Sequence, residues 1–331
     1  MLKKTDYDFI VIGAGAAGLT AAQYGARSGM TTLVIDLSDA GGQALNIFTL
    51  ENYPGVFPSV SGRDFIRNME KQAKSFGAKI VRAKVSSIDK IGGRFVIKTD
   101  GAALTACAVL IATGAQHRKL DARGEKKFAG RGVSYCATCD GPFFKGKRVV
   151  VVGGGDSACS EAFYLASLTD KVLLVHRRGV LRAQKAVADK VLSLPQITVR
   201  YNTVVREIRG SDHVESVLLE NTETHQSVEL PTDAVFVFVG MIPCTDLVSM
   251  LPCDESGYLI TNYKMETLVP GMYAAGDVRA KPFRQIVTAT SDGALAAHQA
   301  HEYVQTMKAA AATASGGAGV TATAAVTIIE R

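Results

Sequence analysis

The feature that most constrains this 331-residue chain is a strand, glycine turn, helix and strand pattern that occurs twice. The first copy begins with Asp8–Gly18, a buried apolar strand that runs into three glycines. The second begins with Lys147–Ala158, 140 positions later and in register. Each continues through a helical stretch into a second apolar strand, at Thr32–Ile35 and at Val172–Val175. These lengths are typical of βαβ units, so we predict an α/β protein with two doubly wound domains.

The order of the remaining segments predicts that one Rossmann-like domain is inserted in the other. Ala108–Gly114 closes the first unit with a buried strand and a turn, and Ala234–Gly240 closes the second in the same way. No third glycine motif follows, so the later residues most simply complete the first domain. From Lys308 onward, 16 of 24 residues are Ala, Thr or Gly, which favours a flexible tail. The expected parts are a discontinuous first domain (1–114 and 246–307), an inserted second domain (115–245) and a tail (308–331).

Composition and charge exclude several classes of protein. The net charge of +6 is scattered along the chain, which is no footprint for nucleic acid. No apolar run approaches the roughly 20 residues that span a bilayer. Phe9–Ala22 follows two lysines as in a signal peptide, but Asp6 and Asp8 interrupt its charged region, and cleavage would destroy the glycine pattern. We therefore expect a cytoplasmic protein with reduced cysteines, bound to neither membrane nor nucleic acid.

The two glycine turns are candidate pyrophosphate sites. A single pattern of this kind is weak evidence, but here Gly13, Gly15 and Gly18 follow a strand and open a helix, and Gly153 and Gly155 do the same. Glycines permit a tight turn and close backbone approach, and the helix N-terminus presents free N–H groups to a phosphate. We predict that both turns bind a dinucleotide.

The second strand of each unit distinguishes the two sites. Counting 23 residues from the first glycine leads to Asp36 in one unit and to His176 in the other. A carboxylate accepts hydrogen bonds from ribose hydroxyls, which suits FAD or NAD. His176 instead begins a cationic cluster with Arg177, Arg178 and Arg182, which suits the 2′-phosphate of NADPH, although a solvated basic face is the alternative. One chain with an FAD-type site and an NADPH site predicts a hydride relay.

Cys136 and Cys139 form a CxxC motif followed at once by Asp140. A zinc half-site would need two more ligands, and the sequence has no second CxxC, so we expect no metal. We favour a redox dithiol because this spacing can close a small disulfide. Asp140 is a candidate proton donor if burial raises its pKa, or else it caps the turn that follows. The remaining cysteines, predicted to be inert core thiols, are Cys107, Cys159, Cys244 and Cys253.

Taken together, these motifs resemble the low-molecular-weight thioredoxin reductases, over about residues 6–305. The CATCD run between the two glycine motifs is the most specific of them, and the others are shared by many two-dinucleotide flavoproteins. The matching segments are Gly13–Gly18, Gly41–Gln43, Glu51–Gly55, Ala112–Gly114, Gly132–Gly141, Gly153–Ala158, His176–Arg178, Ala275–Val278 and Arg284–Ile286.

The resemblance implies an NADPH-dependent thioredoxin-disulfide reductase that passes electrons through FAD and the Cys136–Cys139 disulfide to thioredoxin. It implies a homodimer of FAD domains, each with an inserted NADPH domain that rotates between two poses. Cys139 would face the flavin, Cys136 would attack the disulfide of the partner protein, and Asp140 would move the proton. A glutaredoxin-like or other dithiol protein would be an equally compatible partner.

The same resemblance implies which residues bind the two cofactors. Asp36 would contact the adenosine ribose, Asp277 a ribityl hydroxyl, and the helix that opens at Arg284–Ile286 the pyrimidine end of the flavin. The FAD residues are Gly13, Gly15, Ala16, Ala17, Gly18, Asp36, Gly41, Gly42, Gln43, Asn52, Thr113, Gly114, Gly276, Asp277, Arg284, Gln285 and Ile286. The NADPH residues are Gly153, Gly155, Asp156, Ser157, His176, Arg177, Arg178 and Arg182.

Two rival functions are weighed against this prediction. The flavoprotein component of alkyl hydroperoxide reductase shares the core but adds an N-terminal thioredoxin-like region, for which we expect no room here. Ferredoxin- or flavodoxin-linked reductases and dithiol oxidases tend to lose either the CxxC or the arginines, and this chain keeps both. A non-catalytic redox sensor would need an output surface, and only the tail is unassigned.

Overall fold

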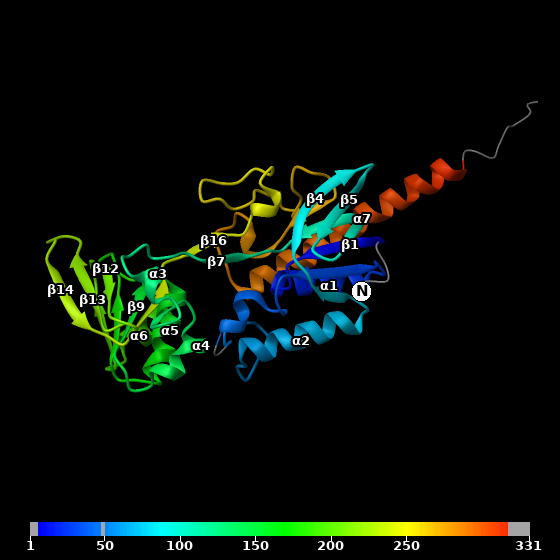
Figure 1. Ribbon diagram of the computed structural model, residues 1–331. Helices are drawn as coiled ribbons and strands as arrows, with labels where there is room; N and C mark the ends of the chain where they lie inside the picture. The colour runs from blue at the N-terminus through cyan, green and yellow to red at the C-terminus, as the bar shows by residue number, and fades with distance from the viewer. Residues whose placement is uncertain (1–5, 48–49, 317–331) are drawn as a thin grey trace, which may run out of the picture.

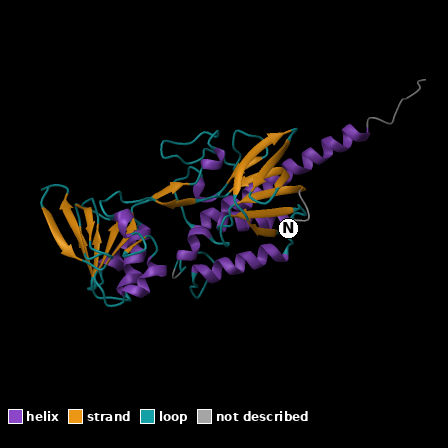
Figure 2. Cartoon of the chain, viewed as in Figure 1, coloured by secondary structure: helices purple, strands orange, loops and turns teal. Residues whose placement is uncertain are grey.

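The computed structural model describes residues 6–47 and 50–316. It folds the chain into two units that lie side by side, joined by a narrow connection (Figure 1). In the connection, β7 (Ala115–His117) pairs antiparallel with β16 (Met241–Pro243). Each unit has its own sheet built around parallel strands, with helices packed on it (Figure 2), which confirms the predicted fold class.

The first unit is built on a sheet in which β3, β2, β1 and β6 lie in that order and run parallel. Its strands are β1 (Asp6–Ile12), β2 (Thr32–Asp36), β3 (Lys79–Arg82), β4 (Val85–Ile91), β5 (Arg94–Thr99), β6 (Ala103–Ile111) and β17 (Met272–Ala274). Of these, β4 and β5 extend the sheet antiparallel. Its helices are α1 (Ala16–Arg27), α2 (Gly62–Ser75) and α7 (Ile286–Gly316), with 3-10 turns η1 (Gly42–Asn46), η3 (Asp246–Val248) and η4 (Gly276–Val278).

The last part of the chain returns to this first unit. Strand β17 pairs parallel with β6, and helix α7 packs along α1. The two helices approach so closely that a Cβ atom at Gly293 would lie 2.1 Å from the carbonyl oxygen of Ala17. This approach positions the turn after β17 beside the glycine turn after β1.

The second unit repeats the same design on a sheet with the order β11, β10, β9, β15, β8, flanked by an antiparallel sheet of β12, β13 and β14. Its strands are β8 (Val133–Ser134), β9 (Val149–Gly153), β10 (Val172–Val175), β11 (Ile197–Arg200), β12 (Thr203–Arg209), β13 (Ser216–Asn221), β14 (Ser227–Pro231) and β15 (Ala234–Phe238). Its helices are α3 (Glu125–Phe128), α4 (Ala137–Asp140), α5 (Asp156–Ala166) and α6 (Lys185–Leu192), with the 3-10 turn η2 (Gly141–Phe144).

Both central strands are buried on their two faces, as expected for parallel sheets covered on both sides. Along β1, Phe9 and Val11 contribute to one apolar core, and Ile10 and Ile12 contribute to the core on the opposite face. The valines of β9 divide between two cores in the same alternating way. This burial fixes the strand ends, where the glycine turns begin.

Helix α7 extends further than the sequence predicted. We expected a flexible tail from Lys308, but the helix continues to Gly316 because its alanine-rich sequence has high helix propensity. The rest of the predicted tail, 317–331, lies outside the described residues. Within 6–47 and 50–316, no helix has the length and apolar character needed to cross a membrane.

Candidate active site

In the first glycine turn, two glycines pack tightly against backbone atoms and the third faces open space. Gly13 has φ +106°, and a Cβ atom there would lie 2.2 Å from the Ala112 carbonyl oxygen. A Cβ at Gly18 would lie 1.9 Å from the carbonyl oxygen of Gly13, so both positions need glycine. Gly15 instead has nothing within 4 Å of its Cβ position, and it precedes α1 with no side-chain cap. A ligand can therefore reach the first N–H groups of α1, at Ala16 and beyond.

Asp36, at the end of β2, accepts backbone hydrogen bonds that stabilise this turn. Its Oδ2 accepts the backbone N–H of Ala14 at 2.6 Å, and its Oδ1 accepts that of Ser38 at 2.9 Å. The carboxylate therefore lies beside the glycine turn, where the spacing predicted it.

Two segments distant in sequence meet the glycine turn at the start of α1. The backbone N–H of Gly41 donates to the carbonyl of Ala14 at 2.9 Å, and a Cβ at Gly42 would lie 3.6 Å from the Cα of Gly15. A Cβ at Gly276 would lie 2.9 Å from that of Ala17. The structure thus brings together most of the residues predicted to bind the first cofactor.

Two polar residues in the segment that follows Gly276 have buried atoms without hydrogen-bond partners. Asp277 Oδ1 and Arg284 Nε are both buried, and neither has such a partner in the described part of the chain. The Lys281 ammonium lies 3.3 Å from Asp277 Oδ1. Nearby, Asn52 donates its side-chain N–H to Gln285 Oε1 at 3.1 Å, just before α7 begins at Ile286. The buried acceptor Asp277 Oδ1 fits a hydroxyl donor on a bound cofactor.

Thr113 and Gly114 lie where the chain leaves the first unit. The Thr113 hydroxyl donates to the carbonyl of Cys244 at 2.6 Å, and the Cys244 N–H donates to the carbonyl of Gly114 at 3.0 Å. These bonds hold the outgoing and returning segments of the connection together.

The second glycine turn repeats the geometry of the first. A Cβ at Gly153 would lie 2.4 Å from the Phe238 carbonyl oxygen, whereas Gly155 has nothing within 4 Å of its Cβ position. Helix α5 begins at the next residue, Asp156, whose carboxylate accepts the backbone N–H of Gln184 at 2.6 Å. Ser157 follows it, exposed in the first turn of the helix.

The cationic cluster at the end of β10 divides into one buried and three exposed side chains. His176 is 4% exposed, and burial, reinforced by the neighbouring arginines, lowers its pKa. Arg177, Arg178 and Arg182 are exposed, and none of them forms an ion pair within the residues that the structure covers. The three arginines are therefore free to bind an anion, and the histidine is not.

Cys136 and Cys139 form a disulfide on the short helix α4 of the second unit. Their Cα atoms are 5.3 Å apart, and the Cys139 N–H points at the Cys136 sulfur from 3.2 Å. The remaining four cysteines are unpaired. Cys107 and Cys159 are buried as predicted, but Cys253 is exposed because it lies in a surface loop between η3 and β17, so that prediction is wrong.

The disulfide faces the first unit at Asn46, the last residue of η1. Asn46 Oδ1 lies 3.3 Å from Cys136 Sγ and 3.6 Å from Cys139 Sγ. The Thr138 hydroxyl donates to the Asn46 carbonyl at 2.7 Å, and Lys190 of α6 pairs with Glu51 at 2.7 Å across the same boundary. No sequence signal pointed to Asn46, because its role depends on how the two units pack.

Beneath α4, the carboxyl of Glu161 on α5 receives the backbone N–H of Ala137. Burial raises the pKa of Glu161 to about 7, and its Oε2 has no hydrogen-bond partner among the described residues. The sequence analysis did not single out this residue either, since one glutamate on an amphipathic helix has no distinguishing pattern.

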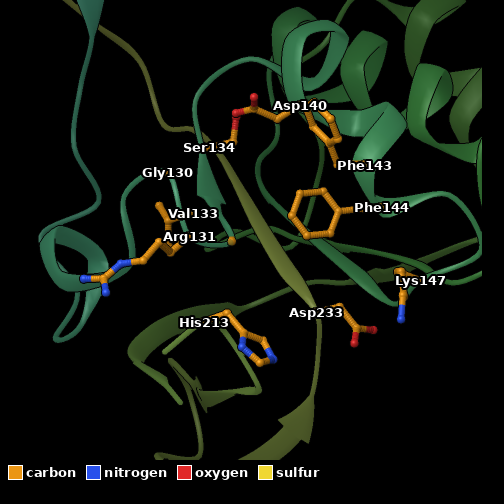
Figure 3. A pocket seen from close by; sticks show the side chains of 11 residues that line it. Gly130, Arg131, Val133, Ser134, Asp140, Phe143, Phe144, Lys147, His213 and Asp233 are labelled. Atoms are coloured by element: carbon orange, nitrogen blue, oxygen red, sulfur yellow. The ribbon is translucent and has the colours of Figure 1, made fainter. Parts of the chain in front are cut away.

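Asp140, the last residue of α4, lines a pocket of about 430 Å³ (Figure 3). Phe143, which is 81% exposed, and Phe144 lie beside it, and Arg131 lies on another wall. Lys147, His213 and Asp233 surround the far end. A pocket lined by apolar and charged side chains therefore begins at Asp140, the residue that follows Cys139.

The comparisons with known proteins agree with this geometry. A model of the pyridine nucleotide-disulphide oxidoreductase family matches residues 7–293. The thioredoxin reductase of Treponema pallidum is 54% identical over 305 residues, which cover 92% of this chain and 99% of that protein. The chain belongs to the low-molecular-weight thioredoxin reductases. It is accordingly a disulfide oxidoreductase of a family that uses a flavin and a pyridine nucleotide.

Solved structures of thioredoxin reductases share the two-unit architecture. The Lactococcus lactis enzyme in its FR conformation is 41% identical, with a TM-score of 0.88 over 90% of this chain and 99% of its own. The Streptococcus pyogenes enzyme is 42% identical, but its TM-score is 0.62 over 92% of this chain and 100% of its own. At nearly equal identity, these two thioredoxin reductases therefore differ in overall arrangement.

Proposed function

We propose that this chain reduces the disulfide of thioredoxin with electrons from NADPH, which pass through FAD and the Cys136–Cys139 pair. The observation that carries the proposal is the position of the disulfide. It lies at the start of helix α4 of the second unit and contacts Asn46, the last residue of the turn η1 that begins at Gly42 in the first unit. A disulfide that faces the first unit beside the Gly41–Gly42 segment is placed to accept electrons from a cofactor bound there.

The residues of the first unit fit FAD. Gly15 leaves room for a pyrophosphate, Asp36 lies at the position for the adenosine ribose, and the buried Asp277 Oδ1 suits a ribityl hydroxyl. When bound, the flavin supplies a two-electron carrier between a nicotinamide and a disulfide. The chain's own part is to hold and orient it, with the N–H groups at the start of α7 toward the charge that reduction creates.

The residues of the second unit fit NADPH. Gly155 and the first turn of α5 suit the pyrophosphate, and three exposed arginines suit the 2′-phosphate through charge-assisted hydrogen bonds. His176 supports the turn from below instead of binding the phosphate.

The dithiol steps follow thiol–disulfide exchange. In the reduced pair, the Cys136 thiolate attacks one sulfur of the partner's disulfide, which forms a mixed disulfide and releases the other partner sulfur as a thiolate. Cys139 then attacks Cys136 Sγ, which re-forms the internal disulfide and frees the second partner thiol. Asp140 would protonate the leaving thiolate, and the pocket beside it would receive the partner's surface.

A rotation of the second unit would let the disulfide and the nicotinamide use one flavin in turn. The narrow connection of β7 and β16 and the different arrangements of the two solved relatives support this. A cross-link between the units should leave one half-reaction intact and abolish turnover. We also propose a homodimer of FAD domains in the cytoplasm, where reducing conditions suit the unpaired cysteines.

Anaerobic titration of the purified protein tests the cofactor assignment. NADPH should bleach the flavin absorbance, and NADH at the same concentration should do so far more weakly. Equal bleaching by both nucleotides, or a colourless protein that cannot be reconstituted with FAD, would refute the proposal.

A further inference from the structure

At the contact between Asn46 and the disulfide, the side-chain oxygen of Asn46, a hydrogen-bond acceptor, faces two sulfurs that carry no hydrogen to donate. Asn46 Oδ1 lies 3.3 Å from Cys136 Sγ and 3.6 Å from Cys139 Sγ. Neither sulfur carries a hydrogen while the two are bonded to each other. The orientation of the carboxamide is set from its other end, because Asn46 Nδ2 donates to Gln43 Oε1 at 3.3 Å. The amide oxygen of Asn46 therefore points at the disulfide, and the disulfide offers it no hydrogen-bond donor.

The other polar groups near the Cys136 sulfur are already engaged. The Thr138 hydroxyl, 3.4 Å from Cys136 Sγ, gives its hydrogen to the Asn46 carbonyl at 2.7 Å. The Cys139 N–H points at Cys136 Sγ as a donor. A thiol at Cys136 could therefore donate a hydrogen bond across the unit boundary to Asn46 Oδ1.

Reduction supplies that hydrogen. When the disulfide takes up two electrons and two protons, the S–S bond breaks and two thiols form. A thiol is a weak hydrogen-bond donor, and an acceptor 3.3 Å from its sulfur is within reach. The acceptor also favours the thiol over the thiolate at that sulfur, because it stabilises only the protonated form.

We propose that Asn46 is a positioning residue that binds the reduced form of the cysteine pair in preference to the disulfide. The second unit is then held more firmly against the first after reduction than before it, and docking in turn favours reduction by the same factor. Cys136 stays protonated while it is docked and becomes a free nucleophile when the units separate. The proposal rests on the redox disulfide, and it is independent of which nucleotide or partner protein the enzyme uses.

The test is a redox equilibrium of the holoenzyme in mixtures of reduced and oxidised dithiothreitol, with no nucleotide or thioredoxin present. Two thiols of the reagent are oxidised to its cyclic disulfide for each protein disulfide reduced. After acid quench and alkylation, mass spectrometry of the peptide with both cysteines gives the reduced fraction. Asn46→Leu removes the acceptor at similar volume, and the equilibrium constant for reduction should fall about threefold, less than a full hydrogen bond would give.

Two further variants separate this role from general docking. Lys190→Met removes the Lys190–Glu51 pair, which spans the same boundary without touching the sulfurs. It weakens docking of both redox forms alike, so it should shift the equilibrium constant much less than Asn46→Leu does. Asn46→Asp keeps an acceptor oxygen and should restore the wild-type value or exceed it. The inference is overturned if Asn46→Leu has no effect, if Lys190→Met shifts the equilibrium equally, or if Asn46→Asp behaves like Asn46→Leu. Failure of the NADPH or thioredoxin assignment would leave this equilibrium untouched.

Discussion

The imidazole of His176 packs directly against Gly154 in the second glycine turn: a Cβ atom at Gly154 would lie 2.2 Å from its Nδ1. The ring is buried, and its pKa is lowered, first by that burial. A neutral, covered imidazole supports the turn from below, whereas the arginines that follow it extend into solvent. We therefore propose that the arginines, not the histidine, bind a phosphate at this position.

Replacing Arg177 and Arg178 together with alanine should raise the KM for NADPH strongly. Each charge-assisted hydrogen bond to the 2′-phosphate is worth about 1.5–3 kcal/mol, so about tenfold to hundredfold is expected per arginine. Steady-state kinetics with both nucleotides checks this, and the KM for NADH should hardly change. Lys185→Ala, which removes an exposed cation already paired with Asp189, is the matched control. Equal losses with NADPH and NADH would show that the cluster does not bind the 2′-phosphate.

Gly15 and Gly18 should respond to substitution in opposite ways. A Cβ atom at Gly15 would meet no other group within 4 Å, so Gly15→Val should fold with nearly unchanged Tm but purify without its yellow colour. Gly18→Ala forces a methyl group to within 1.9 Å of a carbonyl oxygen, so it should lower the Tm. Visible absorbance and thermal unfolding of both proteins distinguish the outcomes. A yellow Gly15→Val protein would mean that no ligand approaches this turn.

Glu161 should make stability depend on pH. Its pKa is raised from the ordinary 4.5 to about 7 by burial, so the folded state binds this proton more tightly than the unfolded chain does. The contribution to the free energy of unfolding is fully present below about pH 4.5 and is lost as the pH rises to about 7. The Glu161→Gln side chain does not ionise, so the variant does not lose stability as the pH rises. It should be more stable than wild type at pH 8, by up to about 3 kcal/mol.

Urea unfolding at pH 5 and pH 8 measures this difference. The exposed Glu255→Gln provides a control that should follow the wild-type pH dependence. If Glu161→Gln differed from wild type by the same amount at both pH values, the raised pKa would be contradicted.

Cys136→Ser should separate the two halves of the reaction. The serine hydroxyl cannot form the mixed disulfide, so reduction of the protein substrate should fall to background. Flavin reduction by NADPH does not use this sulfur and should proceed at close to the wild-type rate in stopped-flow absorbance. The variant would count against the assigned roles if thioredoxin were still reduced at an appreciable rate.

The sequence predicted those features that arise within one βαβ unit. Gly13, Gly153, Asp36 and the ends of the buried strands follow from short-range spacing, and the structure places them as expected. The burial of His176 beneath Gly154 was not predicted, because the spacing that marks a ribose-binding position does not say which way the side chain points. Asn46 was missed for a different reason: it meets Cys136 from 90 positions away, across the boundary between the units.

The extent of α7 shows a further limit. Low complexity at Lys308–Gly316 favours flexibility on composition alone, but its alanines are also the best helix formers and continue a helix already anchored on α1.

The most direct test of the account is anaerobic oxidation of NADPH by the purified enzyme with oxidised thioredoxin as the only acceptor. We predict loss of absorbance at the nicotinamide wavelength in a one-to-one ratio with thioredoxin disulfide reduced, and, when thioredoxin is omitted, only the small stoichiometric loss that reduces the enzyme's own flavin and disulfide. Oxidation of NADPH that produced no thioredoxin thiols, or no oxidation at all in the FAD-loaded protein, would contradict it.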